Sequence, residues 1–573
     1  MTTRRWQFAQ PAPALVTELS RALNLPVLLA ACLVNRGCAN LESAASYLEP
    51  RLAHLSDPFL LPQMDRAVDR LLEAHERKEC FVIFGDYDVD GVTATALLTE
   101  FFRELGCECV FYLPHRLDEG YGLSRDGIAN CLARHDVRLV LAVDCGSKDV
   151  EVISQLQERG IEVIVLDHHQ VSSPAPPAVA LVNPQLLPGD DPLKYLCSAG
   201  LAFKLAHAIL KRARTLGWPR ANEIDLRKYL ELVALGTIAD IVPLKDENRI
   251  FTRIGLEKLG TSSRAGLKAL KSAAGIGGSV TSYEVAFQLA PRLNAAGRLE
   301  SAMDALDLLL TRDSSRAEEL ATTLDQQNRE RQSLEQKIAD EVISALRARF
   351  NPATDFAIVE GCADWHLGVV GIVASRVLRE FHRPVMILGS DGSEEWRGSG
   401  RSIEGFDLAA GLRSCGDLLI KHGGHAMAAG LTIASARLAD LRVRMNALVR
   451  ESVPPEALRP AVRLDTEVAL SDISFQILKL FEKLEPVGQG NPSVQFAAHG
   501  LRLRGETRRL GNAQQHLRFH VTDGQCTHQA LWWNCGEPQF PEVFDLAFAP
   551  ELSEYNGTFG IQLKVIDLRP ANP

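Results

Sequence analysis

The sequence lacks several features, and each absence excludes a class of protein. None of the twelve cysteines forms a Cys-x-x-Cys pair, so neither a zinc ribbon nor a disulfide framework is indicated, and reduced thiols are expected. No apolar segment approaches the ~20 residues needed to cross a bilayer, so we expect no membrane association. The 62 lysines and arginines are outnumbered by 72 aspartates and glutamates. This balance excludes a uniformly basic nucleic-acid-binding surface but not local basic patches.

One short segment imitates a bacterial lipoprotein signal. The sequence LAAC at 29–32 matches the cleavage box, but its apolar run starts only at Val27, after Pro26, and Glu18 lies upstream. These flanks make a poor signal peptide. We therefore interpret the segment as a buried helix and expect the protein to be cytoplasmic.

The length of 573 residues is too great for one core, and ~150 residues per domain suggests about three or four domains. A hydrophobic content of 46% and a charged content of 23% are ordinary for a globular protein. We predict an N-terminal helical cap (1–55), a parallel-sheet domain (56–312), a connecting helix (313–350), a second α/β domain (351–455) and a C-terminal barrel (456–573). In the cap, Asn40 is a candidate helix N-cap.

Short apolar runs alternate with helical patterns after residue 78. Strands are predicted at 81–84, 109–113, 139–143 and 161–166, and helices at 93–105, 124–134 and 148–158. Alternation at this spacing predicts right-handed βαβ units and a parallel sheet. In such sheets ligands bind beyond the carboxyl ends of the strands.

Acidic residues and histidines follow three of these strands. In chain order they are Asp86, Asp88 and Asp90, then Asp144, then Asp167, His168 and His169. If residues 86–90 are extended, their three carboxylates point the same way. Like charges so close repel each other unless they are protonated or bound to cations, which favours a divalent metal site. The alternative for the first group alone is an acidic turn with an aspartate at a helix N-cap.

The remaining patterns predict further helices and two more folded segments. Residues 192–242 look helical, and Asp240 ends an apolar stretch before Pro243; such an aspartate is more often structural. A polar helix without Gly or Pro is predicted at 313–349, joining two domains.

Beyond that helix, strands at 356–359 and 384–388 flank a helix at 368–381. A proline-rich break then precedes alternating runs after residue 461. These runs are typical of antiparallel strands and of a small closed barrel such as an OB fold.

Nine motifs in one order carry a resemblance to a known family. They are DYDVDG (86–91), VDCG (143–146), LDHH (166–169), GTIADIVPL (236–244), RLNAAGRL (292–299), WHLGVVGIVASR (365–376), GSGRS (398–402), GGHAMAAG (423–430) and EPVGQGNP (485–492). This set resembles the DHH phosphoesterase superfamily, and within it the bacterial exonucleases specific for single-stranded DNA. The resemblance implies an α/β protein with a DHH parallel-sheet domain, a DHHA1 domain and an OB-fold barrel. It also implies metal-dependent 5′→3′ hydrolysis of single-stranded DNA to mononucleotides, in DNA repair and recombination.

The resemblance further implies a site with two divalent metal ions, Mn²⁺ or else Mg²⁺, which carboxylates and imidazoles suit as ligands. Asp88 and Asp144 would bind one ion, with Asp86 as an additional ligand. The second ion would be bound by Asp90, Asp144, His168 and Asp240, so that Asp144 bridges the two. His169 would contact the substrate phosphate or orient the site. Asp167 would not bind a metal directly but would accept hydrogen bonds from groups around the ligands. No Ser, Cys or Lys nucleophile is then needed, because the metals activate water.

The same resemblance assigns contacts to DNA. Arg116 would meet a terminal phosphate, and Ser399 and Arg401 would lie in a glycine-flanked phosphate-binding loop. Gly423, Gly424 and His425 resemble a substrate-binding loop. For either glycine cluster alone, a tight turn is the alternative. Donors between the two domains would come from Arg292, Asn294 and Arg298. Trp365 and His366 would either stack on a base or pack in an interface.

The C-terminal segment has a basic signal of its own. Residues 501–520 contain one acidic residue, Glu506, and five arginines, which are Arg502, Arg504, Arg508, Arg509 and Arg518. A basic strand face is how OB folds follow a single-stranded backbone; the alternative is a solvated, charged edge strand. Trp532 and Trp533 would face opposite sides of a strand, so at most one can stack on nucleic acid.

Two other functions are compatible with parts of this pattern. One is a small-substrate relative, such as an oligoribonuclease, a cyclic-dinucleotide phosphodiesterase or a pyrophosphatase, but the basic barrel weighs against it. The other is a catalytically inactive strand-binding replication factor. The presence of every expected metal ligand argues against this function. The resemblance leads us to expect a monomer that works with single-strand-binding protein and a helicase.

Overall fold

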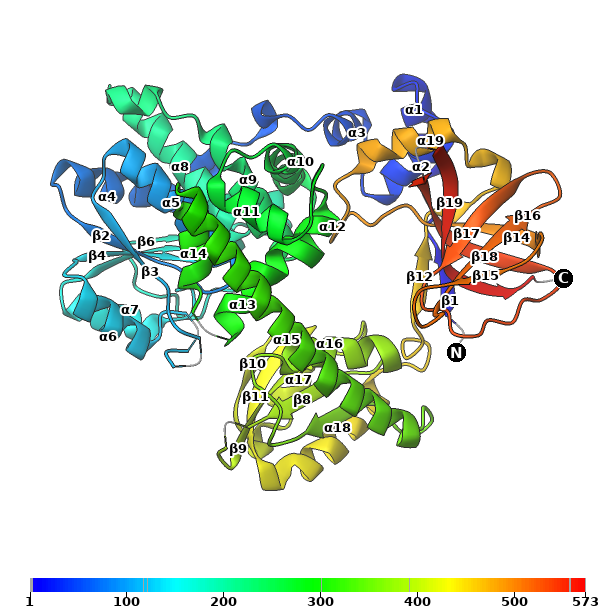
Figure 1. The fold of residues 1–573 in the computed structure, drawn as a ribbon. Coiled ribbons are helices and arrows are strands. Elements are labelled where there is room, and N and C mark those ends of the chain that lie inside the picture. The colour runs from blue at the N-terminus through cyan, green and yellow to red at the C-terminus, as the bar shows by residue number, and fades with distance from the viewer. Residues whose placement is uncertain are drawn as a thin grey trace. The chain divides into compact units, whose positions relative to one another are not determined.

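The computed structural model describes residues 4–116, 118–120, 122–299, 301–390, 392–555 and 558–571. The chain forms two compact units, each of which is described by itself (Figure 1). One unit contains Phe8–Asp325 and Leu464–Pro573, and the other contains Met1–Gln7 and Gln326–Arg463.

The larger unit contains a five-stranded sheet in the order β3-β2-β4-β5-β6. Its strands are β2 (Phe81–Phe84), β3 (Cys109–Tyr112), β4 (Leu139–Val143), β5 (Glu162–Leu166) and β6 (Ala180–Val182). All neighbouring pairs are parallel, so the predicted parallel sheet is confirmed. The short strand β6 was not predicted.

The apolar runs of this sheet are buried on both faces. Phe81 and Ile83 contribute to one hydrophobic cluster, and Val82 and Phe84 contribute to another, because successive side chains of a strand point to opposite faces. The covering helices are α4 (Met64–Glu76), α5 (Val89–Leu105), α6 (Arg125–Arg134) and α7 (Val150–Glu158). Continuous burial explains why these strands are uniformly apolar rather than alternating.

A set of helices extends the first cluster. They are α8 (Ser198–Thr215), α9 (Leu230–Ala239), α10 (Asp246–Gly260), α11 (Ala265–Ala273), α12 (Ser282–Glu284), the π-helical η7 (Val285–Leu289), α13 (Ala290–Leu299) and α14 (Met303–Leu310). The predicted helical stretch 192–242 is interrupted by the short 3-10 turns Pro219–Asn222 and Leu226–Tyr229. Asp240 is the C-cap of α9, just before Pro243, as the proline signal indicated.

The N-terminal segment is helical, with α1 (Pro13–Ala22), α2 (Val27–Asn35) and α3 (Leu41–Leu48). Asn40 caps α3: its Oδ1 accepts from the Ser43 amide at 2.8 Å, as predicted. The LAAC segment is buried in α2, which confirms the predicted helix. The sequence did not indicate that these helices share a hydrophobic cluster with the C-terminal barrel. Across the described residues, no helix is long and apolar enough to span a membrane.

The C-terminal segment forms a barrel, with α19 (Phe475–Phe481) between its first two strands. Its strands are β13 (Thr466–Glu467), β14 (Phe496–Leu503), β15 (Arg508–Leu510), β16 (His516–Thr522), β17 (Thr527–Trp532), β18 (Phe544–Tyr555) and β19 (Thr558–Pro570). They run in the order β13-β14-β18-β19-β17-β16-β15, and an additional β14–β16 pairing closes the sheet. The predicted barrel is therefore confirmed.

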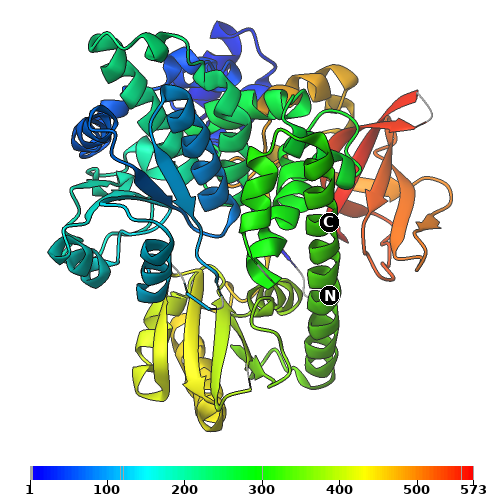
Figure 2. The same ribbon diagram turned by 60° about the vertical axis from the view of Figure 1, so that its left-hand side comes forward.

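The second unit is built on a mixed sheet in the order β10-β11-β9-β8-β7. The strands are β7 (Ile358–Gly361), β8 (Val385–Gly389), β9 (Glu395–Arg401), β10 (Leu419–Gly424) and β11 (Ala428–Ala434). The helices are α15 (Ser314–Arg349), which begins in the first unit, α16 (Val370–Phe381), α17 (Leu408–Arg413) and α18 (Leu438–Ser452). The length of α15, drawn in green, is visible in Figure 2. Outside this sheet, β1 (Arg5–Phe8) pairs with β12 (Ala461–Leu464).

A buried ion pair attaches α2 to the start of the barrel segment. The Arg36 guanidinium donates to Asp465 Oδ1 at 2.9 Å and to the Pro492 carbonyl at 2.7 Å. The two side chains of the ion pair are only 2% and 10% exposed. Because a lone buried charge is costly, removal of one partner destabilises more than the pair itself stabilises.

We expect Arg36→Met to destabilise the packing of α2 by about 3 kcal/mol. Hydrogen–deuterium exchange in peptides covering residues 27–35 should then become about 100-fold faster. Arg51→Met is the matched control, because Arg51 and its partner Glu49 are 66% and 69% exposed, and exposed pairs contribute little. Equal exchange in both variants would contradict the prediction.

Candidate metal and nucleic-acid site

The acidic residues that follow β2, β4 and β5 meet at one edge of the sheet, as the parallel topology predicts. Three groups of potential ligand atoms each lie within 4.8 Å of one another. The groups are Asp86, Asp88 and Asp144; Asp90, His168 and Asp240; and Asp144, His168 and His169. The structure thus brings all of the predicted ligands together, and Asp240 joins them from the end of α9.

The segment that carries the first three aspartates is not extended, and this part of the prediction is wrong. Helix α5 begins at Val89 rather than at residue 93, and Asp88 is its N-cap. The Asp88 carboxylate accepts from the amides of Asp90 and Gly91 at 2.9 and 3.2 Å. Because Asp90 lies in the first helical turn, its carboxylate points to a different group from that of Asp88. Asp88 is therefore both the N-cap of α5 and a candidate metal ligand, so the two interpretations are compatible.

Asp90 is held by the start of α8. Its Oδ2 accepts from the Ser198 amide at 2.6 Å and its Oδ1 from the Ala199 amide at 2.8 Å. Burial raises the pKa of this carboxyl, while His168 partly opposes the shift. Gly236 of α9 permits this packing, since a Cβ there would lie 2.8 Å from Asp90 Oδ1 and 2.6 Å from Thr93 Oγ1.

Asp144 lies between the two groups and has a strained backbone. Its φ of 65° is in the left-handed region, which non-glycine residues adopt at a cost of about 1–3 kcal/mol, often at functional sites. Its Oδ1 accepts from the Ser198 hydroxyl at 2.8 Å. Burial and the neighbouring charges of Asp90 and Asp88 raise its pKa well above the usual range. The fold therefore keeps the Asp144 carboxylate in a buried, acidic environment that disfavours its charged form.

Several buried polar atoms at the site have no hydrogen-bond partner among the described residues. They are Asp86 Oδ1, Asp144 Oδ2 and His168 Nε2. His168 Nε2 lies 3.4 Å from Asp144 Oδ1 and 3.5 Å from Asp240 Oδ2, and burial raises the pKa of Asp240 to about 8. Buried polar atoms are normally satisfied, and carboxylate oxygens with a neutral imidazole are ligands for Mn²⁺ or Mg²⁺. The donor set therefore fits divalent cations.

Asp167 organises the loop that carries the two histidines. Its Oδ1 accepts from the His168 amide at 2.7 Å and lies 2.7 Å from His169 Nδ1. Its Oδ2 accepts from the Ser147 amide at 3.1 Å. Although burial alone would raise its pKa, these interactions with His169, His168 and Ser147 lower it. Asp167 is thus a charged acceptor that fixes the orientation of His169.

Three residues that contact these groups were missed by the sequence analysis. Ser198 donates to Asp144, Ser147 donates to Asp167, and Asn183 donates from Nδ2 to Ser147 Oγ and to the His169 carbonyl, each at 2.8 Å. None lies in a motif whose spacing indicates a ligand. The one local signal is Ser198 at the first position of α8.

The predicted DNA contacts in the first unit lie near the same loop. The Arg116 guanidinium lies over the Tyr87 ring at 5.2 Å, next to Asp86. Asn294 Oδ1 accepts from the Val89 amide at 3.2 Å, and the Nδ2 group of its side chain is the predicted donor. Arg292 pairs with Asp325 at 2.8 Å, and Arg298 follows on α13, close enough for its charge to act on Tyr87.

In the second unit, Ser399 and Arg401 lie in β9, so the predicted glycine-flanked loop is wrong. Residues two apart in a strand share a face, and Arg401 Nη1 donates to Ser399 Oγ at 2.8 Å. Both lie close to Gly371 near the start of α16, where a Cβ would be 3.0 Å from Ser399 Oγ. A helix N-terminus with an arginine and a hydroxyl is suited to a phosphate.

The other predicted residues of this unit have mixed surroundings. Gly423 and Gly424 end β10, and His425 lies in the turn that leads to β11. Trp365 is 7% exposed and donates from Nε1 to Glu341 at 3.3 Å, which favours the packing alternative over base stacking. His366 accepts the Gly368 amide at Nδ1, at 3.1 Å.

The barrel arginines lie on and beside the neighbouring strands β14, β15 and β16. Arg508 is paired with Arg518 across β15 and β16, while Arg502 pairs with Glu542 and Arg504 donates to Thr527. Arg509 donates to the Gln514 carbonyl. Trp532 packs against the barrel core, whereas Trp533 is 48% exposed. These strands therefore carry a basic strip whose charges are only partly neutralised, and Trp533 is accessible beside it.

The comparisons with known proteins agree with this architecture. The DHH family, N-terminal domain, matches residues 80–237, the DHHA1 domain matches residues 354–451, and the RecJ OB domain matches residues 464–567. The chain is 35% identical over 540 residues to the single-stranded-DNA-specific exonuclease RecJ of Haemophilus influenzae, covering 91% of this chain and 93% of that protein. The chain belongs to the RecJ family. It is also 37% identical to the Bacillus subtilis RecJ, covering 93% of this chain but only 66% of that longer protein.

A solved structure supports the same assignment to the RecJ family. The RecJ of Thermus thermophilus in complex with Mn²⁺ superposes with a TM-score of 0.85 and 33% identity, covering 99% of this chain and 80% of that one. Neither alternative function is favoured, because the barrel matches the RecJ OB domain and the acidic residues and His168 are all present at the site.

We predict that Gly236→Ala destabilises the protein by about 1–3 kcal/mol, because the added methyl group would overlap Asp90 and Thr93. Urea denaturation measures the change. Gly260→Ala at the end of α10 is the control, since the added methyl group would lie 3.8 Å from its nearest neighbour, the Val280 amide nitrogen. The control should be neutral or slightly stabilising; a neutral Gly236→Ala would contradict the close packing of α9 on Asp90.

Proposed function

We propose that this member of the RecJ family is a metal-dependent exonuclease that hydrolyses single-stranded DNA from 5′ to 3′ into mononucleotides, in DNA repair and recombination. The observation that carries the proposal is the pair of ligand groups at the carboxyl edge of the sheet, with Asp144 between them. The named activity of the RecJ relatives, single-stranded-DNA-specific exonuclease, supports the substrate class.

The proposed site holds two divalent ions, with Mn²⁺ preferred over Mg²⁺. Asp86, Asp88 and Asp144 would hold one ion, and Asp90, Asp144, His168 and Asp240 the other. Both metals occur in solved structures of Thermus thermophilus RecJ. Two such ions can stabilise the attacking and the leaving oxygens in phosphoryl transfer. The chain supplies their positions: Ser198 holds Asp90 and Asp144, and Asp167 orients His169 toward a substrate phosphate.

Strand binding is proposed for the residues placed near phosphate-binding features. Arg116 would recognise the terminal phosphate of the strand, and Ser399 and Arg401 of the second unit would contact a backbone phosphate. Further contacts would come from His366, Gly423, Gly424, His425, Arg292, Asn294 and Arg298. The barrel arginines would hold the strand while its end is cut, which favours processive digestion.

The cellular setting is proposed from the family resemblance and from the free thiols. All twelve cysteines are unpaired in the structure, as expected in the reducing cytoplasm. We propose that the protein acts there as a monomer, together with single-strand-binding protein and a helicase.

The proposed activity is tested with end-labelled oligonucleotides and Mn²⁺. We expect single-stranded DNA to be degraded to labelled mononucleotide at once when the 5′ end carries the label, and only late when the 3′ end does. A 5′-phosphate should accelerate digestion relative to a 5′-hydroxyl. Duplex DNA, RNA and a dinucleotide are the competing substrates, and preference for the dinucleotide would contradict the proposal.

The shared position of Asp144 generates a second prediction. Asp144→Asn keeps the shape and tolerates the left-handed backbone, but it removes the shared charge. We expect digestion to fall by about 1000-fold, the effect of about 4 kcal/mol in the transition state, while binding of single-stranded DNA changes little. Asp126→Asn, an exposed residue of α6, is the control and should digest normally. Substantial Mn²⁺-dependent digestion by Asp144→Asn would refute the bridging role.

A further inference from the structure

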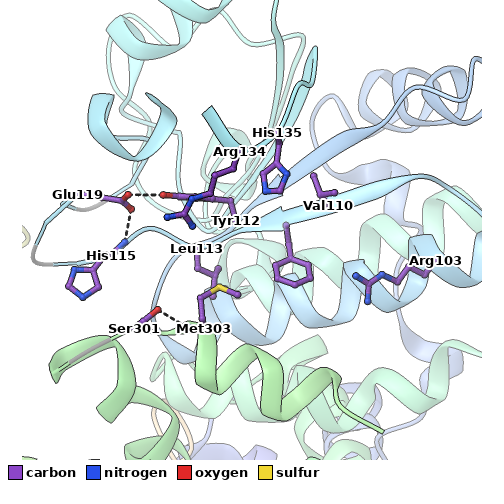
Figure 3. A pocket seen from close by; sticks show the side chains of 11 residues that line it. Arg103, Val110, Tyr112, Leu113, His115, Glu119, Arg134, His135, Ser301 and Met303 are labelled. Atoms are coloured by element: carbon purple, nitrogen blue, oxygen red, sulfur yellow. Dashed lines mark hydrogen bonds between the residues drawn. The ribbon is translucent and has the colours of Figure 1, made fainter. Parts of the chain in front are cut away.

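A second concave site lies beside the outer edge of β3, and none of the predicted metal ligands lines it. Within the described part of the chain β3 pairs only with β2 and forms one edge of the sheet. A pocket of about 560 Å³ lies against it, lined from β3, from Arg103 of α5, from the end of α6, and from Ser301 and Met303 before and in α14 (Figure 3). Such volumes are usual for ligand sites.

The backbone of β3 offers both donors and acceptors on this edge. The carbonyls of Glu108 and Tyr112 accept from the amides of Phe81 and Gly85 at 3.3 and 3.0 Å, so they face β2. Because successive residues of a strand alternate, the amides and carbonyls of Cys109 and Phe111 face outward. An edge of this kind is a template for another extended chain.

Two exposed arginines, Arg103 and Arg134, flank the edge. The Arg103 guanidinium lies 5.7 Å from the Phe111 ring centroid, and the Arg134 guanidinium lies 5.4 Å from that of Tyr112. The charge of Arg134 acts on the Glu119 carboxylate, so this arginine is partly compensated, whereas Arg103 forms no ion pair within the described part of the chain. An aromatic face positions a cation but does not neutralise it. The chain has a net charge of −10, but these two exposed arginines make the surface locally positive.

The acidic groups near the pocket are already engaged. Glu119 accepts from the Tyr112 hydroxyl at 2.6 Å and from the His115 amide at 2.7 Å, as drawn in Figure 3, and Asp118 pairs with His115 Nδ1 at 2.8 Å. The remaining lining is largely apolar, with Val110, Phe111, Leu113 and Met303. The site therefore combines apolar contacts, two exposed arginines and an open strand edge.

We propose that this edge of β3 binds an extended acidic segment of a partner protein as an added strand, with apolar residues in the pocket and carboxylates on Arg103 and Arg134. A peptide fits better than a nucleic-acid strand, because the outward carbonyls of Cys109 and Phe111 need donors and a phosphodiester backbone has none. The four residues of β3 match about 13 Å of an extended chain. This inference does not rest on the proposed nuclease activity.

The probe is a fluorescein-labelled octapeptide of alternating aspartate and valine, and fluorescence anisotropy with the whole protein measures its binding. We expect saturable binding that Arg103→Gln with Arg134→Gln weakens by about tenfold or more. The matched control is Arg138→Gln with Arg159→Gln, two exposed arginines outside the pocket, which should retain binding within about twofold. Digestion of single-stranded DNA should be unchanged in both double variants.

A second peptide tests strand pairing apart from charge. N-methylation of alternate residues blocks the edge hydrogen bonds and keeps the carboxylates, so affinity should fall by about tenfold. Equal binding of the methylated peptide, equal loss in both double variants, or no binding to the wild-type protein would each overturn the proposal. Displacement of the peptide by a single-stranded oligonucleotide whose own affinity depends on Arg103 and Arg134 would assign the site to nucleic acid instead. The single variants Arg103→Gln and Arg134→Gln repeat the test if the double variant unfolds.

Discussion

The mutual repulsion of buried carboxylates is the constraint on which the rest of the first unit depends. Asp86, Asp90 and Asp144 are each only 1% exposed, and burial raises the pKa of each. No arginine or lysine pairs with them among the described residues. The fold offsets their cost with amides and hydroxyls, chiefly from the start of α8, and leaves specific oxygen atoms unsatisfied. Such a site is organised for cations before any cation binds.

The sheet and its functional edge could be predicted because both follow from local pattern. Apolar runs of four to five residues, separated by helical periods, define β2, β4 and β5, and the topology then places the following aspartates together. The start of α5 could not be predicted in this way. Val89 and Asp90 have weak helix propensity, and the helix begins there because Asp88 caps it and Gly91 allows the backbone of residue 86 to approach.

The parts that sequence reasoning missed depend on contacts between distant segments. Ser198 lies more than 50 residues from Asp144, and its position at the start of α8 does not by itself indicate a role at the site. The position of Ser399 and Arg401 was misjudged for a related reason: glycines at 398 and 400 suggested a loop, but they lie in β9. A Cβ at Gly398 would lie 2.5 Å from the Leu388 side chain in β8, and one at Gly400 would lie 2.6 Å from the Leu408 side chain in α17. Close approach of these neighbours explains the glycines.

The joining of the first and last parts of the chain has a consequence for biosynthesis. Strand β1 pairs with residues 461–464, and the apolar faces of α1 and α2 pack on a barrel that starts beyond residue 464. At ~5–20 residues per second, a ribosome needs about 20–90 s to make the intervening chain. During that time the N-terminal helices have emerged without the surface that covers them. An apolar surface exposed for that time is of the kind that chaperones cover during synthesis.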